Sequence, residues 1–197
     1  MSRSTEFVQT YWPFAQRMEK EYDVPALVAM AQSALETGWG DHAPGNMMFG
    51  MKCGKSWAGG KQLLTTTEYH KTDTKTYPQV ISIEWIEAKG KFKYRVKDYF
   101  RKYPNPYESF ADYAKVLRKL KRYAPAFEYT QDPERFAYEI WRGGYATDPN
   151  YPEKINAMMN IIKGKLPVKK KLPVKKKTSF WGGGLWNWEP FGKNYLK

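Results

Sequence analysis

Cysteine and histidine are nearly absent from this sequence of 197 residues. A single cysteine, Cys53, excludes an intrachain disulfide, and only His42 and His70 are available as imidazole ligands. The zinc motif His-Glu-x-x-His, the motif Cys-x-x-Cys and a glycine-rich phosphate loop are all missing. We therefore expect no disulfide framework, no metal site and no organic cofactor.

Long apolar runs are also lacking. No stretch is long enough to cross a membrane as a helix, and residues 1–16 contain no apolar segment of the kind found in signal peptides. The sequence therefore predicts neither a membrane span nor a cleavable leader. If the protein acts outside the cytoplasm, we expect another route to carry it there.

Acidic residues are fewer than basic ones, and the excess of positive charge is uneven. Residues 165–197 hold nine Lys and one Glu, which is +8 of the total net charge of +13, so +5 remains for residues 1–164. A mildly basic domain suits an anionic polymer as its partner. We expect a folded domain over 1–164, a Lys/Pro-rich linker over 165–178 and an aromatic, glycine-rich tail over 179–197.

The expected linker contains a tandem repeat. The hexapeptide Leu-Pro-Val-Lys-Lys-Lys occurs at 166–171 and again at 172–177. Proline and clustered like charges resist packing, which favours an extended linker. A nucleic-acid-binding arm is the weaker alternative, because no DNA-binding module accompanies the repeat. We expect the aromatic tail to dock on the preceding domain, a partner or an envelope surface.

The most apolar helical stretch ends in a glutamate. Residues 25–35 (PALVAMAQSAL) are apolar almost all round, which predicts a buried helix. Glu36 follows, and Gly38 suits the left-handed position that stops a helix. A dry core and the negative end of a helix dipole both raise the pKa of a carboxyl, and such an acid can donate a proton in glycosidic bond cleavage. From position alone, an ordinary solvated glutamate is an equal alternative.

The remaining elements predict an α+β fold. Helices are expected over residues 5–22, 25–37, 109–121, 133–141 and 152–163. Pro13 predicts a break or kink in the first of them, and Ser109 is the expected N-cap of the third. Alternating β-branched and aromatic residues predict strands over 61–70 and roughly 77–99, with a hairpin turn at 88–91.

Four short segments follow one another in a distinctive order. They are SALETGWG at 33–40, HAPGNMMFGMK at 42–52, LLTTTEYH at 63–70 and GGYATDPNYPEKI at 143–155. Together they resemble the glucosaminidases of glycoside hydrolase family 73, which include flagellar-type and autolysin-type peptidoglycan hydrolases. The resemblance covers roughly residues 6–163 and implies a lysozyme-like fold, with a mostly helical lobe, a small antiparallel β-lobe and a sugar-binding cleft between them.

The resemblance implies roles for particular residues. Glu36 becomes the general acid of an endo-β-N-acetylglucosaminidase that cuts the β-1,4 bond after N-acetylglucosamine in peptidoglycan, while Glu68 and Tyr145 match its other catalytic positions. The implied substrate-binding residues are Trp39, Asn46, Phe49, Gly50, Lys52, Tyr69 and Tyr151. We expect Trp39 to pack on the hinge between the lobes, and packing in the core explains this residue as well as stacking on a sugar does. Two Met residues after Asn46 shift the family spacing Asn-x-Phe-Gly-x-Lys.

The second catalytic group is less clearly indicated. Glycosidases usually need two carboxylates. Glu68 lies in a Thr-rich segment that predicts an exposed strand, and we expect it to reach the cleft when the β-lobe closes. Other acidic residues of the same lobe compete for the role; they are Asp73, Glu84 and Glu87. Alternatively, the substrate's own acetamido group attacks, with Tyr145 orienting it or the water.

Other functions stay open at this point. A lysozyme-like muramidase or lytic transglycosylase could use the same glutamate, and a non-catalytic wall-binding or phage structural module could share the fold. We expect a monomer whose partner is the peptidoglycan glycan strand. Without a leader, we expect synthesis in the cytoplasm and access to the wall through phage lysis as a bacteriolytic endolysin, through virion delivery or through non-classical secretion.

Overall fold

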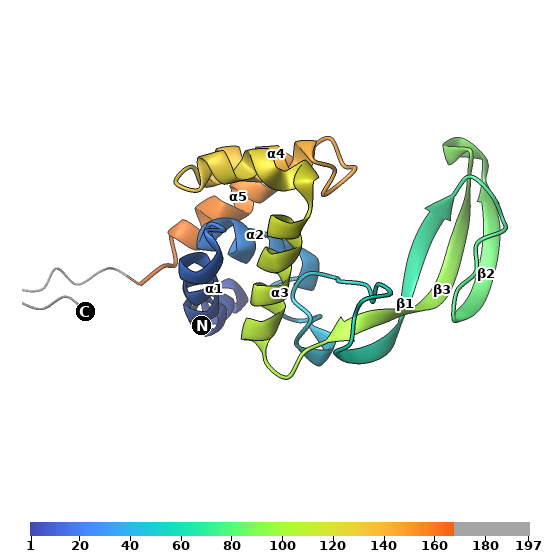
Figure 1. Cartoon of the computed structure of the whole chain (residues 1–197), viewed down its shortest axis with the longest axis horizontal. Helices are drawn as coiled ribbons and strands as arrows, with labels where there is room; N and C mark the ends of the chain where they lie inside the picture. The colour runs from blue at the N-terminus through green and yellow to red at the C-terminus, as the bar shows by residue number, and fades with distance from the viewer. Residues whose placement is uncertain (168–197) are drawn as a thin grey trace, which may run out of the picture. The chain divides into compact units, whose positions relative to one another are not determined.

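A computed structural model describes residues 1–167 of the protein. In this part of the chain, the helices and one small sheet form separate lobes (Figure 1). The helices are α1 (Arg3–Tyr22), α2 (Ala26–Thr37), α3 (Pro106–Lys119), α4 (Pro133–Arg142) and α5 (Tyr151–Lys163), and the strands are β1 (Gly60–His70), β2 (Gln79–Ile86) and β3 (Lys91–Lys102). Short 3-10 helices are η1 (Pro44–Asn46), η2 (Glu87–Lys89) and η3 (Lys121–Tyr129). The predicted α+β, lysozyme-like class is confirmed. None of the described helices combines the length and apolar character that a membrane crossing requires.

The apolar helix α2 is the centre of the helical lobe. Helices α1, α4 and α5 pack on it, and α3 packs on α1 (Figure 1). Four alanines of α2 are buried, and their small side chains let the neighbouring helices approach closely. Gly38 ends the helix at φ +58°, and its N–H donates to the carbonyl of Ala34, as predicted.

Helix α1 runs through Pro13 without the predicted break. Proline removes one backbone hydrogen bond and costs a helix interior about 3 kcal/mol. Phe7 and Val8 before it and Ala15 and Met18 after it are all buried. Packing of these two halves on the same core outweighs the local cost, so the element continues as one helix.

The N-cap of helix α3 lies four residues earlier than predicted. Asn105, not Ser109, is its N-cap, because the Asn105 side chain accepts the N–H of Glu108 at 3.1 Å and Pro106 occupies the first helical position. The Ser109 side chain is buried and accepts the N–H of Met48 at 2.9 Å. It therefore fixes the loop that follows α2 onto α3.

The antiparallel sheet has the strand order β1-β3-β2. The turn between β2 and β3 forms at Glu87–Lys89, close to the predicted hairpin. Glu68 of β1 lies opposite Tyr94 of β3. On the same face, at the base of the sheet, Leu64 packs against the small cluster of Met47, Phe100 and Tyr103, of which Met47 belongs to the loop that follows α2. Because side chains alternate along a strand, the face that carries Glu68 is the one turned toward the helical lobe.

Backbone hydrogen bonds join the loop before β1 to the end of β3. The N–H of Cys53 donates to Tyr99, that of Arg101 to Met51 and that of Tyr103 to Gly45, at 2.8–2.9 Å. These bonds attach the sheet to the helical lobe at its base. The predicted linker and tail, 165–178 and 179–197, lie outside the described residues apart from the first three and stay predictions.

Candidate active site

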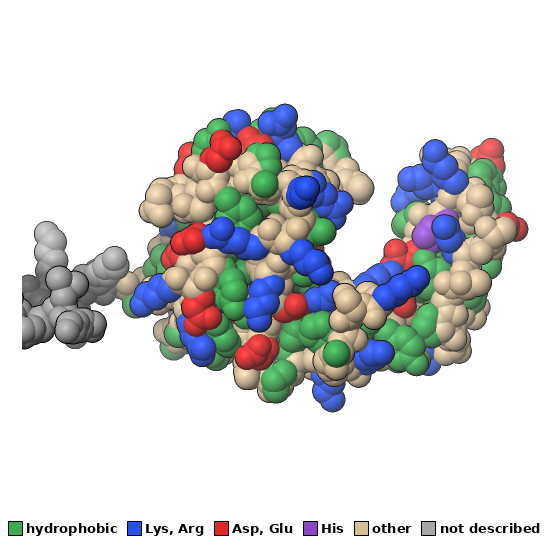
Figure 2. Space-filling model, in the orientation of Figure 1, with side chains coloured by type: hydrophobic (Ala, Val, Ile, Leu, Met, Phe, Trp, Pro, Cys, Tyr) green, Lys and Arg blue, Asp and Glu red, His purple; other side chains and the backbone are tan. Residues whose placement is uncertain are grey.

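A cavity of about 330 Å³ opens beside the C-terminal end of α2. Residues from four segments of the chain line it: Glu36, Phe49, Gly50, Met51, Val116, Leu117, Leu120, Arg122, Tyr123, Gly144 and Tyr145. The structure thus brings together four predicted site residues from three separate motifs: Glu36, Phe49, Gly50 and Tyr145. Figure 2 shows the surface hollowed between the helices and the sheet.

Glu36 occupies the last turn of α2 and its side chain is exposed to the cavity. Surrounding protein still removes much of its water, and this burial raises the pKa of the Glu36 carboxyl. The predicted direction of the shift is confirmed. Gly50 stands close to the carboxyl: a Cβ at Gly50 would lie 3.6 Å from Glu36 Oε2, and its φ of +55° favours glycine.

Tyr145 faces the same cavity from the turn after α4. Burial, together with neighbouring groups that include Glu36, raises the pKa of Tyr145 well above its ordinary value. Its hydroxyl therefore keeps its proton and can act as a hydrogen-bond donor. Its ring lies 5.9–6.3 Å, centroid to centroid, from the rings of Tyr113, Tyr123 and Tyr151.

A buried polar network supports this wall of the cavity. The Gln32 side chain is fully buried in α2, donates to the hydroxyl of Tyr151 at 2.8 Å and accepts from the hydroxyl of Tyr113. Phe49 stacks on Tyr113 at 4.1 Å between ring centroids. Tyr151 is only 5% exposed. Tyr151 does not line the cavity, and its ring lies 5.9 Å from that of Tyr145, so its contact with substrate stays a prediction.

Glu68 lies on the sheet, apart from the residues that line this cavity. Its carboxylate is 2.7 Å from Lys52 Nζ, which also lies 3.0 Å from the carboxylate of Asp98. Burial opposes the charge on Lys52, but the bonds to Glu68 and Asp98 outweigh it and raise the pKa of Lys52. The β-lobe thus offers two carboxylates held by one cation.

Asp98 was missed in the sequence, because only the pairing of β1 with β3 places it beside Glu68. It pairs with Leu64 in the sheet register and so shares the face of Glu68. The competing Glu84 is on the other face, 3.7 Å from Lys93 Nζ. Arg122 and Tyr123 of the cavity were also missed, because no pattern in the sequence predicted η3.

Three predicted binding residues lie away from the cavity. The Trp39 ring meets the ring of Phe7 in α1 edge to face at 5.7 Å, so it packs on the helical core and not on a hinge. The Asn46 side chain donates to the carbonyl of Tyr103 at 2.9 Å and holds the loop. Tyr69, next to Glu68 in β1, points to the opposite face of the sheet, where Lys89 Nζ lies 4.1 Å from its ring.

Comparisons with known proteins find similar sequences. A glucosaminidase family model, described as mannosyl-glycoprotein endo-beta-N-acetylglucosaminidase, matches residues 12–164. The peptidoglycan hydrolase FlgJ of Pseudomonas aeruginosa is 35% identical over 157 residues, which cover 76% of this chain and 34% of that protein. The exo-glucosaminidase LytG of Bacillus subtilis is 30% identical over 161 residues, 78% of this chain and 49% of that protein. The chain thus spans half or less of the length of these relatives.

Similar folds are found among solved structures. The C-terminally truncated glycoside hydrolase domain of FlgJ from Salmonella typhimurium is 30% identical, with a TM-score of 0.60, and the match covers 82% of this chain and 98% of that one. A peptidoglycan hydrolase from Sphingomonas sp. A1 is also 30% identical, with a TM-score of 0.60 and coverage of 82% and 92%.

Proposed function

The chain belongs to the glucosaminidase family, glycoside hydrolase family 73, and from this premise we propose that it is an endo-β-N-acetylglucosaminidase of peptidoglycan. It hydrolyses the β-1,4 bond after N-acetylglucosamine in the glycan strand. One observation carries the proposal: Glu36, whose pKa is raised, faces a cavity that is also lined by the protonated Tyr145.

In this mechanism Glu36 donates its proton to the oxygen of the glycosidic bond as the bond from that oxygen to C1 of N-acetylglucosamine breaks. The hydroxyl of a water molecule ends on C1. The proton of that water goes to Glu68 of the sheet as the base. Alternatively, the acetamido oxygen of the substrate bonds to C1 as the glycosidic oxygen leaves, and water then opens this intermediate while the Glu36 carboxylate takes its proton. Tyr145 donates a hydrogen bond that positions the reacting ring or the water.

The test is digestion of purified peptidoglycan by the wild-type protein and by Glu36→Gln, followed by borohydride reduction and mass analysis of the new ends. We expect reduced N-acetylglucosamine ends from the wild type, and a loss of about 100-fold or more in the variant, because Gln keeps the shape but has no transferable proton. Early release of internal fragments would distinguish endo cleavage from the exo action named for LytG.

Other products would redirect the proposal. Ends of N-acetylmuramic acid would indicate a muramidase, and anhydromuramic ends a lytic transglycosylase, both with Glu36 as acid. If several wall types released nothing, the protein would be a wall-binding or phage structural module. Delivery by a phage or a virion is part of the proposal, and lysis of cells only when a membrane-permeabilising protein is co-expressed would support it.

A further inference from the structure

A second cavity, of about 390 Å³, adjoins the first along α3. It is lined by Ser56, Trp57, Arg101, Asp112, Lys115, Val116, Lys119 and Leu120. Val116 and Leu120 also line the cavity of Glu36, so the two cavities share a wall. A polymer bound beside Glu36 can therefore reach the second cavity without leaving the surface.

The second cavity is positively charged. Arg101, Lys115 and Lys119 contribute three cations, and Asp112 is its one carboxylate. Asp112 is already paired, with Arg101 at 2.5 Å and the hydroxyl of Tyr103 at 2.7 Å. Lys115 and Lys119 are exposed, and Lys and Arg side chains gather over this part of α3 in Figure 2. Two cations therefore remain for an anionic ligand.

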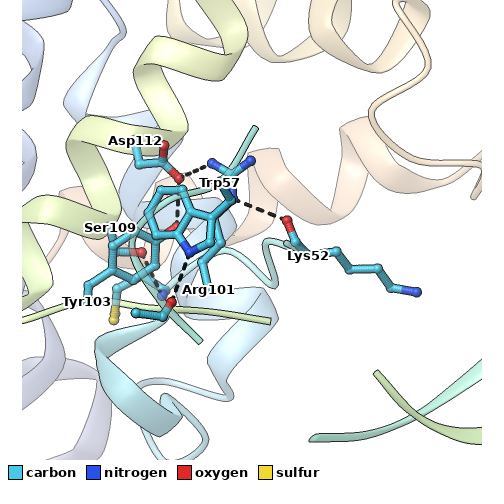
Figure 3. A network of polar contacts seen from close by, with 8 residues as sticks. Lys52, Trp57, Arg101, Tyr103, Ser109 and Asp112 are labelled. Atoms are coloured by element: carbon cyan, nitrogen blue, oxygen red, sulfur yellow. Dashed lines mark hydrogen bonds and ion pairs between the residues drawn. The ribbon is translucent and has the colours of Figure 1, made fainter. Parts of the chain in front are cut away.

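One side of the cavity is a fixed aromatic ring (Figure 3). The Trp57 indole donates to the carbonyl of Gly60 at 2.9 Å and lies 4.6 Å below the guanidinium of Arg101. Tyr103 meets it edge to face at 5.7 Å. Gly59 makes room for this ring, since a Cβ there would lie 2.4 Å from Trp57. The indole of Trp57 and the guanidinium of Arg101 are thus held in place before any ligand binds.

We propose that this second cavity binds the peptide stems of the peptidoglycan strand whose sugars occupy the first cavity, an inference that rests on the proposed function. The stems hang from the glycan at regular intervals and carry free carboxylates beside short alkyl groups. Lys115 and Lys119 pair with the carboxylates, and Trp57 packs against the alkyl groups. The site selects glycan that still bears stems over bare glycan.

The test uses the full chain with Glu36→Gln, so that the strand is bound and not cut. The ligands are soluble glycan strands with tetrapeptide stems, free of secondary wall polymers, and the same strands after an amidase has removed the stems. Isothermal titration compares the Lys115→Gln/Lys119→Gln pair with a control pair, Lys20→Gln/Lys163→Gln, which changes the charge equally on α1 and α5.

We expect the Lys115/Lys119 pair to weaken binding of stem-bearing strands by about three- to tenfold, as two exposed charge contacts would, and to leave stripped strands unchanged. The control pair should alter neither. Equal weakening for both strand types, equal weakening by the control pair, or no preference for stems overturns the inference. The proposed function is tested separately, by whether the wild-type protein, in which Glu36 is intact, cleaves strands from which the stems have been removed.

Discussion

At the scale of single residues, the ionisation of Glu36 controls the expected chemistry. Its raised pKa comes from burial beside the cavity. A general acid works only while it is protonated, so we expect kcat/KM on peptidoglycan to fall as the pH rises through the raised pKa of Glu36. A pH profile of the wild type measures this limb. If the residual activity of Glu36→Gln fell with pH in the same way, the fall in kcat/KM would belong to the ionisation of another group.

The same shift has a consequence for stability. A carboxyl whose pKa is higher in the folded state stabilises the fold fully below its unfolded pKa, and this contribution is lost as the pH rises through the folded pKa. Above that pH, the charged carboxylate of Glu36 in its desolvated position lowers the free energy of unfolding, whereas a neutral Gln does not. We expect Glu36→Gln to have an unchanged or slightly higher Tm than wild type at neutral pH. Thermal unfolding of both proteins at acid and neutral pH measures this difference in Tm. A lower Tm of Glu36→Gln than of wild type at neutral pH would contradict the prediction.

The two carboxylates on Lys52 can be separated by mutation. If Glu68 is the base, Glu68→Gln should lower kcat by about 100-fold, since removal of a general base has effects of this size. Asp98→Asn should lower it only slightly, by loosening Lys52. Steady-state kinetics on peptidoglycan decides between them. A small loss with Glu68→Gln beside a large one with Glu36→Gln would instead indicate catalysis assisted by the acetamido group.

At the scale of helices and strands, the cap of α3 gives a test in stability. Asn105→Ala removes the side chain that caps the helix and should cost about 1 kcal/mol. Ser109→Ala leaves the N–H of Met48 buried without its acceptor, which costs about 1–3 kcal/mol. Urea unfolding of both variants measures the free energies. If Asn105→Ala left the free energy of unfolding unchanged while Ser109→Ala frayed the first turn of α3, Ser109 and not Asn105 would be the cap.

The sequence predicted those elements whose pattern is strong over many residues. The apolar run of α2, its stop at Gly38 and the alternation of β1 are local signals, and all three are present in the fold. A serine suits an N-cap, which predicts the start of α3 at Ser109, yet Asn105 before Pro106 is the better signal. For η3, no such pattern was recognised.

Side-chain direction was the harder part of the site. Glu36 and Tyr145 could be assigned through motifs, but the orientation of Trp39 and Tyr151 depends on neighbours distant in sequence, Phe7 and Gln32. Asp98 became visible only with the register of β1 against β3. Contacts of this kind are properties of the tertiary structure, and no local spacing specifies them.

At the scale of the whole molecule, stability should differ between the two lobes. Strand β2 is at an edge of the sheet, and nearly all its side chains are exposed, whereas most of α2 is buried. Local opening is easiest where few apolar groups are buried. We expect the amides of β2 to exchange with deuterium about 100-fold faster than those of α2. Native-state exchange with mass detection measures this, and equal protection would show that both lobes unfold as one unit.

The strand order β1-β3-β2 also bears on how the chain is made. Strand β1 ends at His70, but its partner β3 is complete only at Lys102. At a synthesis rate of about 5–20 residues per second, a newly made β1 therefore waits about two to six seconds for its partner. Three consecutive threonines, Thr65–Thr67, occupy its middle in place of aliphatic residues. A β-forming but polar segment is a poor template for aggregation. Strand β1 can therefore stay unpaired during synthesis without pairing with other chains.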